Sequence, residues 1–354
     1  MAVKTTSDEI LKKIKVLIVD DAAFMRKAIF NMIEGDAQIE VVGTARNGQE
    51  GLEQIEKLHP DVITLDIDMP IMDGITSIRH IMIKSPVPVV VLSSLFNDGT
   101  ITFDALRLGV VDFIPKPSGA VSTDIDRSRQ HLIDRIKLAS EVNMSNIRRV
   151  RLPQWEMNKN LDHYGYRPLD YLLALGTTLS GPNTIVRLLA NLPPTLPAAV
   201  VVVVEMSPKI LSAFIERFDM LVPWEICEAQ DGIQLKQGVC YLSSYQNSIR
   251  VQTLPDGTYG LKKAETTYEP LNQLFTSAAD AFQQNTIGVL LTGIGTDGAE
   301  GFAYIQKMSG VTLAQNTQTC VYPNLTDNAI KRGTVNTVLD ETELPQAIIS
   351  IMDE

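Results

Sequence analysis

The sequence predicts two doubly wound parallel α/β domains joined by a basic connecting segment. Three observations lead to this prediction: strand-like and helix-like segments alternate along most of the chain, the strand-like runs are largely apolar, and charge is unevenly distributed. Continuous apolar runs are typical of parallel strands that helices cover on both faces. The chain has 354 residues, 45% of them hydrophobic and 21% charged, which is enough for two domains of ordinary globular composition.

The distribution of charge suggests where the domains end. Residues 1–126 contain 12 basic and 19 acidic side chains (net −7), residues 127–167 contain 9 and 4 (net +5), and residues 168–354 contain 10 and 19 (net −9). We therefore expect a first domain at 1–126, a closing helix and linker at 127–167, and a second domain at 168–354. Nucleic-acid-binding proteins usually present a basic domain or face, so we expect no nucleic-acid partner.

Other features of the composition indicate a cytoplasmic protein. No apolar run approaches the roughly 20 residues that span a bilayer, and the polar N-terminus lacks the apolar segment of a secretory signal. The three cysteines have no metal-binding spacing, which fits buried thiols in a reducing compartment. We therefore expect no membrane insertion.

The first domain begins with a regular succession of strands and helices. Helical segments are expected at Ala22–Glu34 and Gly48–Leu58. Five strands in about 110 residues predict a flavodoxin-like doubly wound sheet, whose ligands bind beyond the carboxyl ends of the strands. The expected strands are Val16–Val19, Val41–Thr44, Val62–Leu65, Val87–Leu92 and Val111–Ile114.

Chemically active side chains follow these strands directly. Asp20 and Asp21 follow the first strand, Asp66 the third, Ser93 the fourth and Lys116 the fifth. Three carboxylates at one edge of a sheet repel one another, and a hard divalent cation such as Mg²⁺ relieves that repulsion. A carboxylate beside Mg²⁺ is a plausible phosphoryl acceptor, with the serine hydroxyl and the lysine ammonium contacting the phosphoryl oxygens.

These residues resemble the response-regulator receiver family over about the first 120 residues. The matching segments are Asp20-Asp21, Asp66-Ile-Asp-Met-Pro-Ile-Met-Asp-Gly74, Ser93 and Lys116-Pro117. The resemblance implies Asp66 as the phosphorylated residue, Mg²⁺ ligation by Asp20, Asp21 and Asp66, and phosphate contacts from Ser93 and Lys116. It also places Phe113 at the position of the family's switch aromatic.

The second half of the chain resumes the same alternation after an amphipathic helix at Thr123–Ser145 and a segment without periodicity at 146–167. Asp256-Gly257 predicts the turn of a β-hairpin between Ile249–Leu254 and Tyr259–Lys262. The expected strands are Leu172–Gly176, Ala199–Glu205, Val239–Ser243, Gly288–Thr292 and Val311–Gln315, and the expected helices are Asn183–Asn191, Pro208–Met220, Leu271–Gln284, Asp297–Lys307 and Leu344–Met352.

One loop of this domain, Gly293-Ile-Gly-Thr-Asp-Gly298, matches the glycine pattern of dinucleotide-binding folds. That function needs an acid at the end of the next strand to bind a ribose hydroxyl. Here the strand ends in Gln315-Asn316, with no acid nearby, so we do not expect a dinucleotide site.

The second domain resembles the catalytic domain of chemotaxis protein-glutamate methylesterases, in which a receiver precedes the same α/β domain. The matching segments are Gly181-Pro182, Leu192-Pro193, Glu228-Ala-Gln-Asp-Gly232, Gly238-Val-Cys-Tyr241, Leu291–Gly298 and Ala314-Gln315. The family hydrolyses methyl esters on receptor glutamates and deamidates certain glutamines through a serine–histidine–aspartate triad. The resemblance implies a chemotaxis-type histidine kinase as phosphodonor and chemoreceptors or signalling-array proteins as partners.

The triad positions depart from the family pattern. Thr178 stands at the serine position and Glu205 at the histidine position, and only Asp297 matches. A hydroxyl nucleophile needs a base such as a neutral imidazole, and an ordinary glutamate is far too weak a base. We therefore expect a catalytically inactive domain that acts by binding partners, with no cofactor of its own.

Three alternatives to this expectation stay open. Burial of Glu205 beside Asp297 could raise its pKa and give an active, phosphorylation-dependent methylesterase/glutamine deamidase. The same two acids could form a metal pair, although the sequence supplies no third ligand. Ser180 could replace the nucleophile, but its position favours a role in capping the following helix.

Overall fold

The computed structural model describes residues 13–93, 99–116, 122–147, 169–265 and 267–353. The chain divides into two compact units, Met1–Ser94 with Val110–Val142, and Leu95–Gly109 with Asn143–Glu354. The predicted linker from residue 148 to 167 lies outside the described residues. Within the part of the chain that the structure describes, no helix combines the length and apolar character of a membrane span.

The sheet of the first unit is parallel, with the strand order β2-β1-β3-β4-β5. The strands are β1 (Ile14–Val19), β2 (Ile39–Ala45), β3 (Val62–Leu65), β4 (Val89–Ser93) and β5 (Asp112–Pro115). The chain runs from β1 outward to β2 and then returns to β3 on the other side of β1. The order therefore reverses between β1 and β3, which is where ligands bind in sheets of this kind.

Right-handed crossovers place α1 and α5 on one face of this sheet and α2 and α3 on the other. The Asp73 side chain accepts a hydrogen bond of 2.7 Å from the Thr76 amide and so caps α3. Gly74 begins α3 so close to β3 that a Cβ atom would lie 2.4 Å from the Asp66 carbonyl oxygen. The helices of this unit are α1 (Ala23–Ile33), α2 (Gly48–Leu58), α3 (Gly74–Lys84) and α5 (Ser122–Ser140), whereas α4 (Gly99–Leu108) and the short 3₁₀ helix η1 (Met144–Asn146) belong to the second unit.

The second unit contains a seven-stranded parallel sheet with the order β14-β13-β12-β6-β7-β9-β8, and a separate hairpin of β10 and β11. The order reverses between β6 and β12, the equivalent of the reversal in the first unit. The strands are β6 (Tyr171–Thr177), β7 (Ala198–Val204), β8 (Glu225–Glu228), β9 (Val239–Ser244), β10 (Ile249–Thr253), β11 (Tyr259–Lys263), β12 (Thr286–Leu290), β13 (Val311–Gln315) and β14 (Thr337–Leu339).

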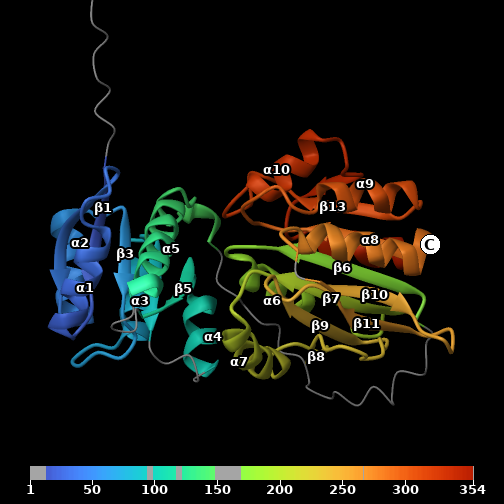
Figure 1. Ribbon diagram of the computed structural model, residues 1–354, viewed down its shortest axis with the longest axis horizontal. Helices are drawn as coiled ribbons and strands as arrows, with labels where there is room; N and C mark the ends of the chain where they lie inside the picture. Colours follow the sequence, from blue (N-terminus) through green and yellow to red (C-terminus); the bar gives the residue numbers. More distant parts are fainter. Residues whose placement is uncertain (1–12, 94–98, 117–121, 148–168, 266, 354) are drawn as a thin grey trace, which may run out of the picture. The chain divides into compact units, whose positions relative to one another are not determined.

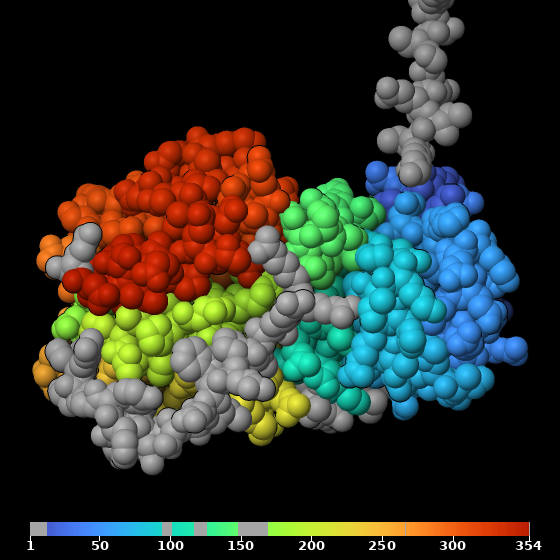
Figure 2. All heavy atoms as spheres, turned by 180° about the vertical axis from the view of Figure 1, so that it is seen from behind, coloured from blue at the N-terminus to red at the C-terminus, as the bar shows by residue number. Residues whose placement is uncertain are grey.

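Helices cover both faces of this sheet (Figure 1). On one face α8 packs against β6 and β12 and also against the hairpin, and α9 packs against β12 and β13. On the other face α11 lies against α6, as the red and yellow-green surfaces of Figure 2 show. The helices are α6 (Gly181–Ala190), α7 (Pro208–Asp219), α8 (Pro270–Phe282), η3 (Gln283–Asn285), α9 (Ala299–Lys307), α10 (Asn324–Lys331) and α11 (Leu344–Asp353).

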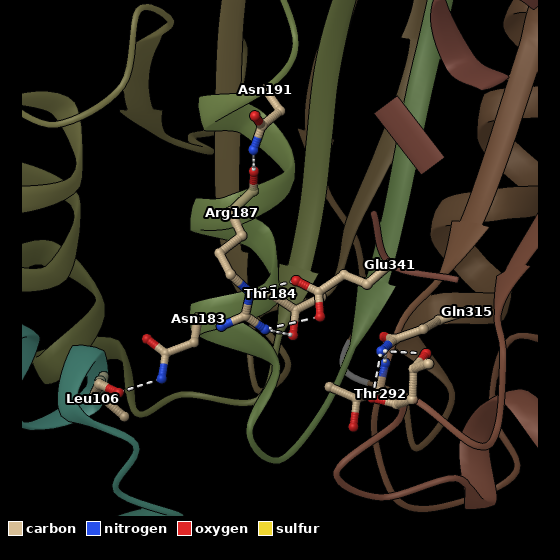
Figure 3. Close-up of polar contacts among 9 residues, drawn as sticks. Leu106, Asn183, Thr184, Arg187, Asn191, Thr292, Gln315 and Glu341 are labelled. Atoms are coloured by element: carbon tan, nitrogen blue, oxygen red, sulfur yellow. Dashed lines mark hydrogen bonds and ion pairs between the residues drawn. The ribbon is translucent and has the colours of Figure 1, made fainter. Parts of the chain in front are cut away.

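A buried ion pair joins α6 to the segment that follows β14 (Figure 3). The Arg187 guanidinium binds both carboxylate oxygens of Glu341, through Nε and through Nη2 at 3.0 Å, and Nη2 also donates to the Thr184 hydroxyl at 3.0 Å. Glu341 is buried, so its charge requires this partner. The pair therefore fixes the C-terminal part of the fold onto α6.

The fold class predicted from the sequence is confirmed, and the differences are three elements that were not predicted and one helix that begins later than expected. The sequence did not predict β8, β14 or α10, and two of these are strands of only four and three residues. The helix expected from Asp297 begins at Ala299, which leaves Asp297 in the preceding loop. Its carboxylate binds a different helix, as described below.

Candidate functional site

The first unit brings three carboxylates together where its strand order reverses. Asp20 follows β1 and Asp66 follows β3, and the carboxylate oxygens of Asp20, Asp21 and Asp66 lie within 4.8 Å of one another. Asp20 and Asp66 are buried, whereas Asp21 is exposed. The convergence expected from the strand ends is therefore present in the fold.

Lys116 extends from the end of β5 between two of these carboxylates. Its Nζ atom lies 2.8 Å from Asp20 Oδ2 and 2.7 Å from Asp66 Oδ2. Burial raises the pKa of Asp66 and outweighs the opposing effect of Lys116. Burial alone would lower the pKa of Lys116, but its interactions with Asp20 and Asp66 raise it. The ammonium therefore remains charged beside the two carboxylates.

The carboxylate cluster fits a hard divalent cation. Asp20 Oδ2 is buried, and within the described residues it has no polar partner besides Lys116. Two buried carboxylates and an exposed one supply oxygen ligands while leaving room for water, which is the donor set that Mg²⁺ prefers. The remaining Asp66 oxygen, Oδ1, accepts a hydrogen bond of 2.8 Å from the Ile67 amide.

Ser93 and Phe113 lie on the neighbouring strands β4 and β5. Ser93 is buried at the end of β4, and its carbonyl oxygen accepts a hydrogen bond of 3.0 Å from the Lys116 amide. Phe113 pairs in register with Val91 and is half-buried. The backbone thus places Ser93 next to Lys116 at the same edge of the sheet.

The second unit forms its own site where β6 and β12 end. Thr178 follows β6, and its hydroxyl forms two hydrogen bonds with one residue of the loop after β12. It accepts from the Ile294 amide at 2.6 Å and donates to the Ile294 carbonyl at 3.0 Å. The hydroxyl proton of Thr178 is thus held by a backbone carbonyl, and Thr178 clamps the two loops together.

Close packing supports this clamp. A Cβ atom on Gly293 would lie 2.5 Å from the Thr178 hydroxyl, so only glycine fits there. The adjacent Thr292 is held on both sides: Thr177 Oγ1 donates to its carbonyl at 2.6 Å, and its amide donates to Gln315 Oε1 at 3.0 Å (Figure 3). The glycine-rich loop is therefore fixed by neighbouring strands, and Gln315 supports it through the Thr292 amide.

Asp297 caps a helix. Its Oδ2 accepts hydrogen bonds from the Leu271 amide (2.7 Å) and the Tyr245 hydroxyl (3.0 Å), and its Oδ1 accepts from the Asn272 amide (2.9 Å). These amides belong to the first turn of α8 and would otherwise lack acceptors. Burial raises the pKa of Asp297 despite these hydrogen bonds.

The capping is reciprocal, because α8 in turn caps α9. The Asn272 side-chain oxygen accepts hydrogen bonds from the Gly298 amide at 3.0 Å and the Gly301 amide at 2.8 Å. Asp297, which lies just before α9, therefore caps the N-terminus of α8, and Asn272 of α8 caps the N-terminus of α9. This arrangement requires Asp297 and Asn272 for stability, independently of any catalysis.

The Tyr245 hydroxyl, which donates to Asp297, lies in an acidic environment. Burial and the charges of Asp297, Glu205 and Glu269 raise the pKa of the Tyr245 hydroxyl well above its ordinary value, so it is a hydrogen-bond donor at neutral pH. Glu205 follows β7 and is half-buried. The sequence contains no histidine after His163, so residues 164–354 supply no imidazole to this site.

Ser180 stands at the N-cap position of α6, but its side chain makes no capping hydrogen bond to the helix. The capping role expected from the sequence is therefore wrong. The reason is conformational: Ser180 has φ 61°, a left-handed conformation, whereas a capping serine has an extended backbone.

Tyr245 and the capping role of Asn272 were not predicted from the sequence. Tyr245 directly follows β9, and its amide donates to the Val204 carbonyl at 2.7 Å. The rule that side chains after strands converge at one edge would have indicated Tyr245. No comparable signal exists for Asn272, because its partners lie 26 and 29 residues away.

Comparison with known proteins identifies two family matches. Residues 16–123 match the response regulator receiver domain, and residues 173–348 match the CheB methylesterase domain. Protein-glutamate methylesterase/protein-glutamine glutaminase 1 of Oleidesulfovibrio alaskensis is 36% identical, over 95% of this chain and 99% of its own. Protein-glutamate methylesterase/protein-glutamine glutaminase of Geobacillus kaustophilus is 35% identical, and the match covers 97% of this chain and 100% of that protein. The crystal structure of the response regulator domain of Thermotoga maritima CheB is 43% identical, covers 37% of this chain and 99% of its own, and gives a TM-score of 0.35.

Proposed function

The chain belongs to the CheB methylesterase family of chemotaxis response regulators, and we propose that phosphorylation of Asp66 controls a second domain that binds partners without hydrolysing esters. The observation that supports this proposal best is the double hydrogen bond between the Thr178 hydroxyl and the Ile294 backbone. A nucleophilic hydroxyl needs a base to accept its proton. Here that proton is donated to a carbonyl oxygen.

The first unit supports phosphorylation at Asp66. We propose that Asp20, Asp21 and Asp66 hold Mg²⁺, which would neutralise charge that develops on the phosphoryl group. An Asp66 carboxylate oxygen would form the new bond to phosphorus while the donor's bond to phosphorus breaks. Lys116, already 2.7 Å from Asp66, would contact a phosphoryl oxygen together with the Ser93 hydroxyl, and Phe113 would respond to the movement of Ser93.

The second unit supports binding better than catalysis. Glu205 replaces the imidazole, and residues 164–354 contain no histidine that could act as the base. Asp297 has its carboxylate hydrogen-bonded to α8 and to Tyr245. In comparable hydrolases, loss of a triad member lowers the rate by several orders of magnitude. We propose a chemotaxis-type histidine kinase as the phosphodonor, and chemoreceptors or signalling-array proteins as partners.

An active methylesterase or glutamine deamidase is the second candidate. Two observations favour it: relatives that match almost the whole chain are named for these activities, and Asp297 is buried beside Tyr245. In that case Glu205 would have to act as the base, with its pKa raised by its surroundings.

The decisive experiment measures methanol release from methylated chemoreceptor membranes after phosphorylation of the whole chain with acetyl phosphate and Mg²⁺. We expect no release above buffer from the natural sequence. The variant Thr178→Ser with Glu205→His tests whether the site can still be restored, and Asp66→Asn controls for phosphorylation. Release from the natural sequence that depends on Asp66 would contradict the proposal and make Glu205 the candidate base.

A further inference from the structure

The loop between β1 and α1 carries two of the three carboxylates of the cluster in the first unit, those of Asp20 and Asp21. The carboxylate oxygens of both residues converge with those of Asp66. Their backbone carbonyl oxygens converge elsewhere, on one nitrogen of the Arg26 side chain. Nη1 of Arg26 donates to the Asp20 carbonyl at 2.7 Å and to the Asp21 carbonyl at 2.8 Å. A single guanidinium thus fixes the backbone of both residues.

The contact with Arg26 matters most for Asp21. Within the described residues, Asp21 makes no hydrogen bond other than the one that its carbonyl accepts from Arg26. Asp20 has additional contacts, because its amide donates to the Ala45 carbonyl at 3.1 Å and its Oδ1 accepts from the Ala22 amide at 2.9 Å. Asp21 is also exposed, so neighbouring side chains do not restrain it by burial. The position of the Asp21 carboxylate in the cluster therefore depends on Arg26.

The position of Arg26 in α1 is unfavourable for the helix itself. The N-terminus of a helix carries partial positive charge, so acidic side chains are favourable there and cations are not. α1 begins at Ala23, its first turn contains no acidic residue, and its N-cap, Ala22, makes no side-chain capping bond. Arg26 nevertheless lies close to this end and reaches back to the loop before the helix. Helix stability does not account for a cation here, whereas support of the acidic loop does.

The charge of Arg26 and its hydrogen bonds should affect a cation site in opposite directions. A guanidinium beside Asp20 and Asp21 repels a divalent cation held by their carboxylates, which weakens binding. Its hydrogen bonds fix the two ligands before the cation arrives, which reduces the entropy lost on binding. Groups that orient metal ligands commonly change metal affinity by about tenfold or more. A measurement of affinity therefore separates the two effects by their sign.

We propose that Arg26 is a positioning residue for the divalent cation of the phosphorylation site. It holds the backbone of Asp20 and Asp21 so that their carboxylates are arranged with that of Asp66 before Mg²⁺ binds. Arg26 acts through these residues and is not itself a ligand, because a guanidinium has no acceptor atom. The inference rests on the function proposed for the first unit and adds to it a residue outside the carboxylate cluster.

The test measures Mg²⁺ affinity directly, by isothermal titration calorimetry of the whole unphosphorylated chain with MgCl₂. Arg26→Met removes the donors and keeps much of the length of the side chain, and it should weaken Mg²⁺ binding about tenfold. Lys27→Met is the matched control, because it removes the same charge from the next position of α1, which is exposed. This control should leave the affinity unchanged or raise it, since only repulsion is lost.

Arg26→Lys tests the hydrogen bonds at constant charge. Lysine keeps the positive charge and supplies donors on a shorter side chain. It should therefore bind Mg²⁺ more tightly than Arg26→Met, although its charge alone would act in the opposite direction. Thermal unfolding in the presence of EDTA gives the temperature range in which all variants are folded, and the titrations are made within it.

Phosphorylation by acetyl phosphate provides a second readout. In Arg26→Met, the Mg²⁺ concentration that gives the half-maximal rate should rise about tenfold, while the rate at saturating Mg²⁺ should change less than about twofold. An arginine that only stabilises the fold would not shift the half-maximal Mg²⁺ concentration. The Mg²⁺ dependence of Lys27→Met should match that of the natural sequence.

Three results would overturn the proposal: absence of Mg²⁺ binding by the natural sequence, an affinity of Arg26→Met that equals or exceeds the natural one, and an equal loss of affinity in Lys27→Met. The function proposed above can fail separately. If acetyl phosphate left Asp66 of the natural sequence unmodified while Arg26→Met still weakened Mg²⁺ binding, phosphorylation would be refuted and the role of Arg26 would stand.

Discussion

The two units place polar residues at the same topological position, where the strand order of a parallel sheet reverses, but they use them differently. In the first unit, Lys116 is shared between the Asp20 and Asp66 carboxylates, and the part of the chain that the structure describes offers Asp20 Oδ2 no other polar partner. In the second unit, the Thr178 hydroxyl and the Asp297 carboxylate are fully engaged in bonds to backbone and to Tyr245.

This difference shows that the fold alone does not make a site reactive. A reactive site keeps groups whose best partner is the ligand or the transferred group. The first unit keeps such groups at the carboxyl ends of its strands. The second unit has used the equivalent edge to connect loops and to cap helices, so substitutions there should change stability more than chemistry.

The largest expected effect is at Asp66. Asp66→Asn should abolish phosphorylation by acetyl phosphate in the presence of Mg²⁺, because the amide cannot act as the phosphoryl acceptor. Intact-protein mass spectrometry would detect the added phosphoryl group. Asp68→Asn removes the same charge from an exposed position two residues away and should retain phosphorylation. Persistent modification of the Asp66 variant would place the acceptor elsewhere.

The next largest effect is expected at Asp297. Asp297→Ala should lower the free energy of unfolding by about 2–3 kcal/mol, because two amides of α8 and the Tyr245 hydroxyl lose their acceptor. Urea denaturation would measure the loss. Asp280→Ala is a matched control, since Asp280 also accepts from a tyrosine hydroxyl, that of Tyr304, but at an exposed position. Equal stability of the Asp297 variant and the natural sequence would show that the carboxylate is not a structural cap.

Thr178 offers a test of the clamp itself. Thr178→Val keeps the shape but removes the hydrogen bonds to the half-buried Ile294 amide and carbonyl, so the free energy of unfolding should fall by about 1–3 kcal/mol. Thr178→Ser retains the hydroxyl and should change stability by less than about 1 kcal/mol. If both variants were equally stable, the hydroxyl would be free for another role, and the contrast between the units would weaken.

A smaller effect of opposite sign is expected at Ser180. Ser180→Gly should stabilise the protein by up to about 1 kcal/mol, because glycine adopts the left-handed conformation without the strain of a side chain. Ser180→Ala keeps the strain and should not stabilise. A differential scan of thermal unfolding distinguishes these variants, and destabilisation by glycine would indicate that the serine side chain is needed at the loop.

The smallest effect concerns the Asp36–Lys137 ion pair of the first unit, where Nζ lies 2.8 Å from Oδ2. The hydrogen bond from Lys137 lowers the pKa of Asp36. The pair therefore stabilises the fold above the ordinary aspartate pKa of about 3.9, and this contribution is lost as pH falls through the lowered value. Asp36→Asn should reduce stability by about 0.2–1 kcal/mol at pH 7, and this reduction should disappear as the pH falls through the lowered pKa of Asp36. If the difference in stability between Asp36→Asn and the natural sequence grew on acidification, the ion pair would not stabilise the fold in the way described.

The sequence alone determined the fold class and showed which side chains follow the carboxyl ends of the strands. Apolar runs such as Val200–Val204 identify buried parallel strands because their environment is apolar on both faces. Asp20, Asp66 and Lys116 could be assigned to one site because the carboxyl ends of parallel strands meet at one edge. The resemblance to the methylesterase family also led to the prediction that Thr178 and Glu205 stand at the serine and histidine positions of the triad.

The tertiary structure decided what the second site does with its residues. The partners of Thr178 and Asp297 lie 116 and at least 25 residues away, so local pattern carries no information about them. The left-handed backbone at Ser180 likewise depends on loop geometry. A sequence specifies which side chains reach an edge of the sheet, but only packing determines which of them remain available to a ligand.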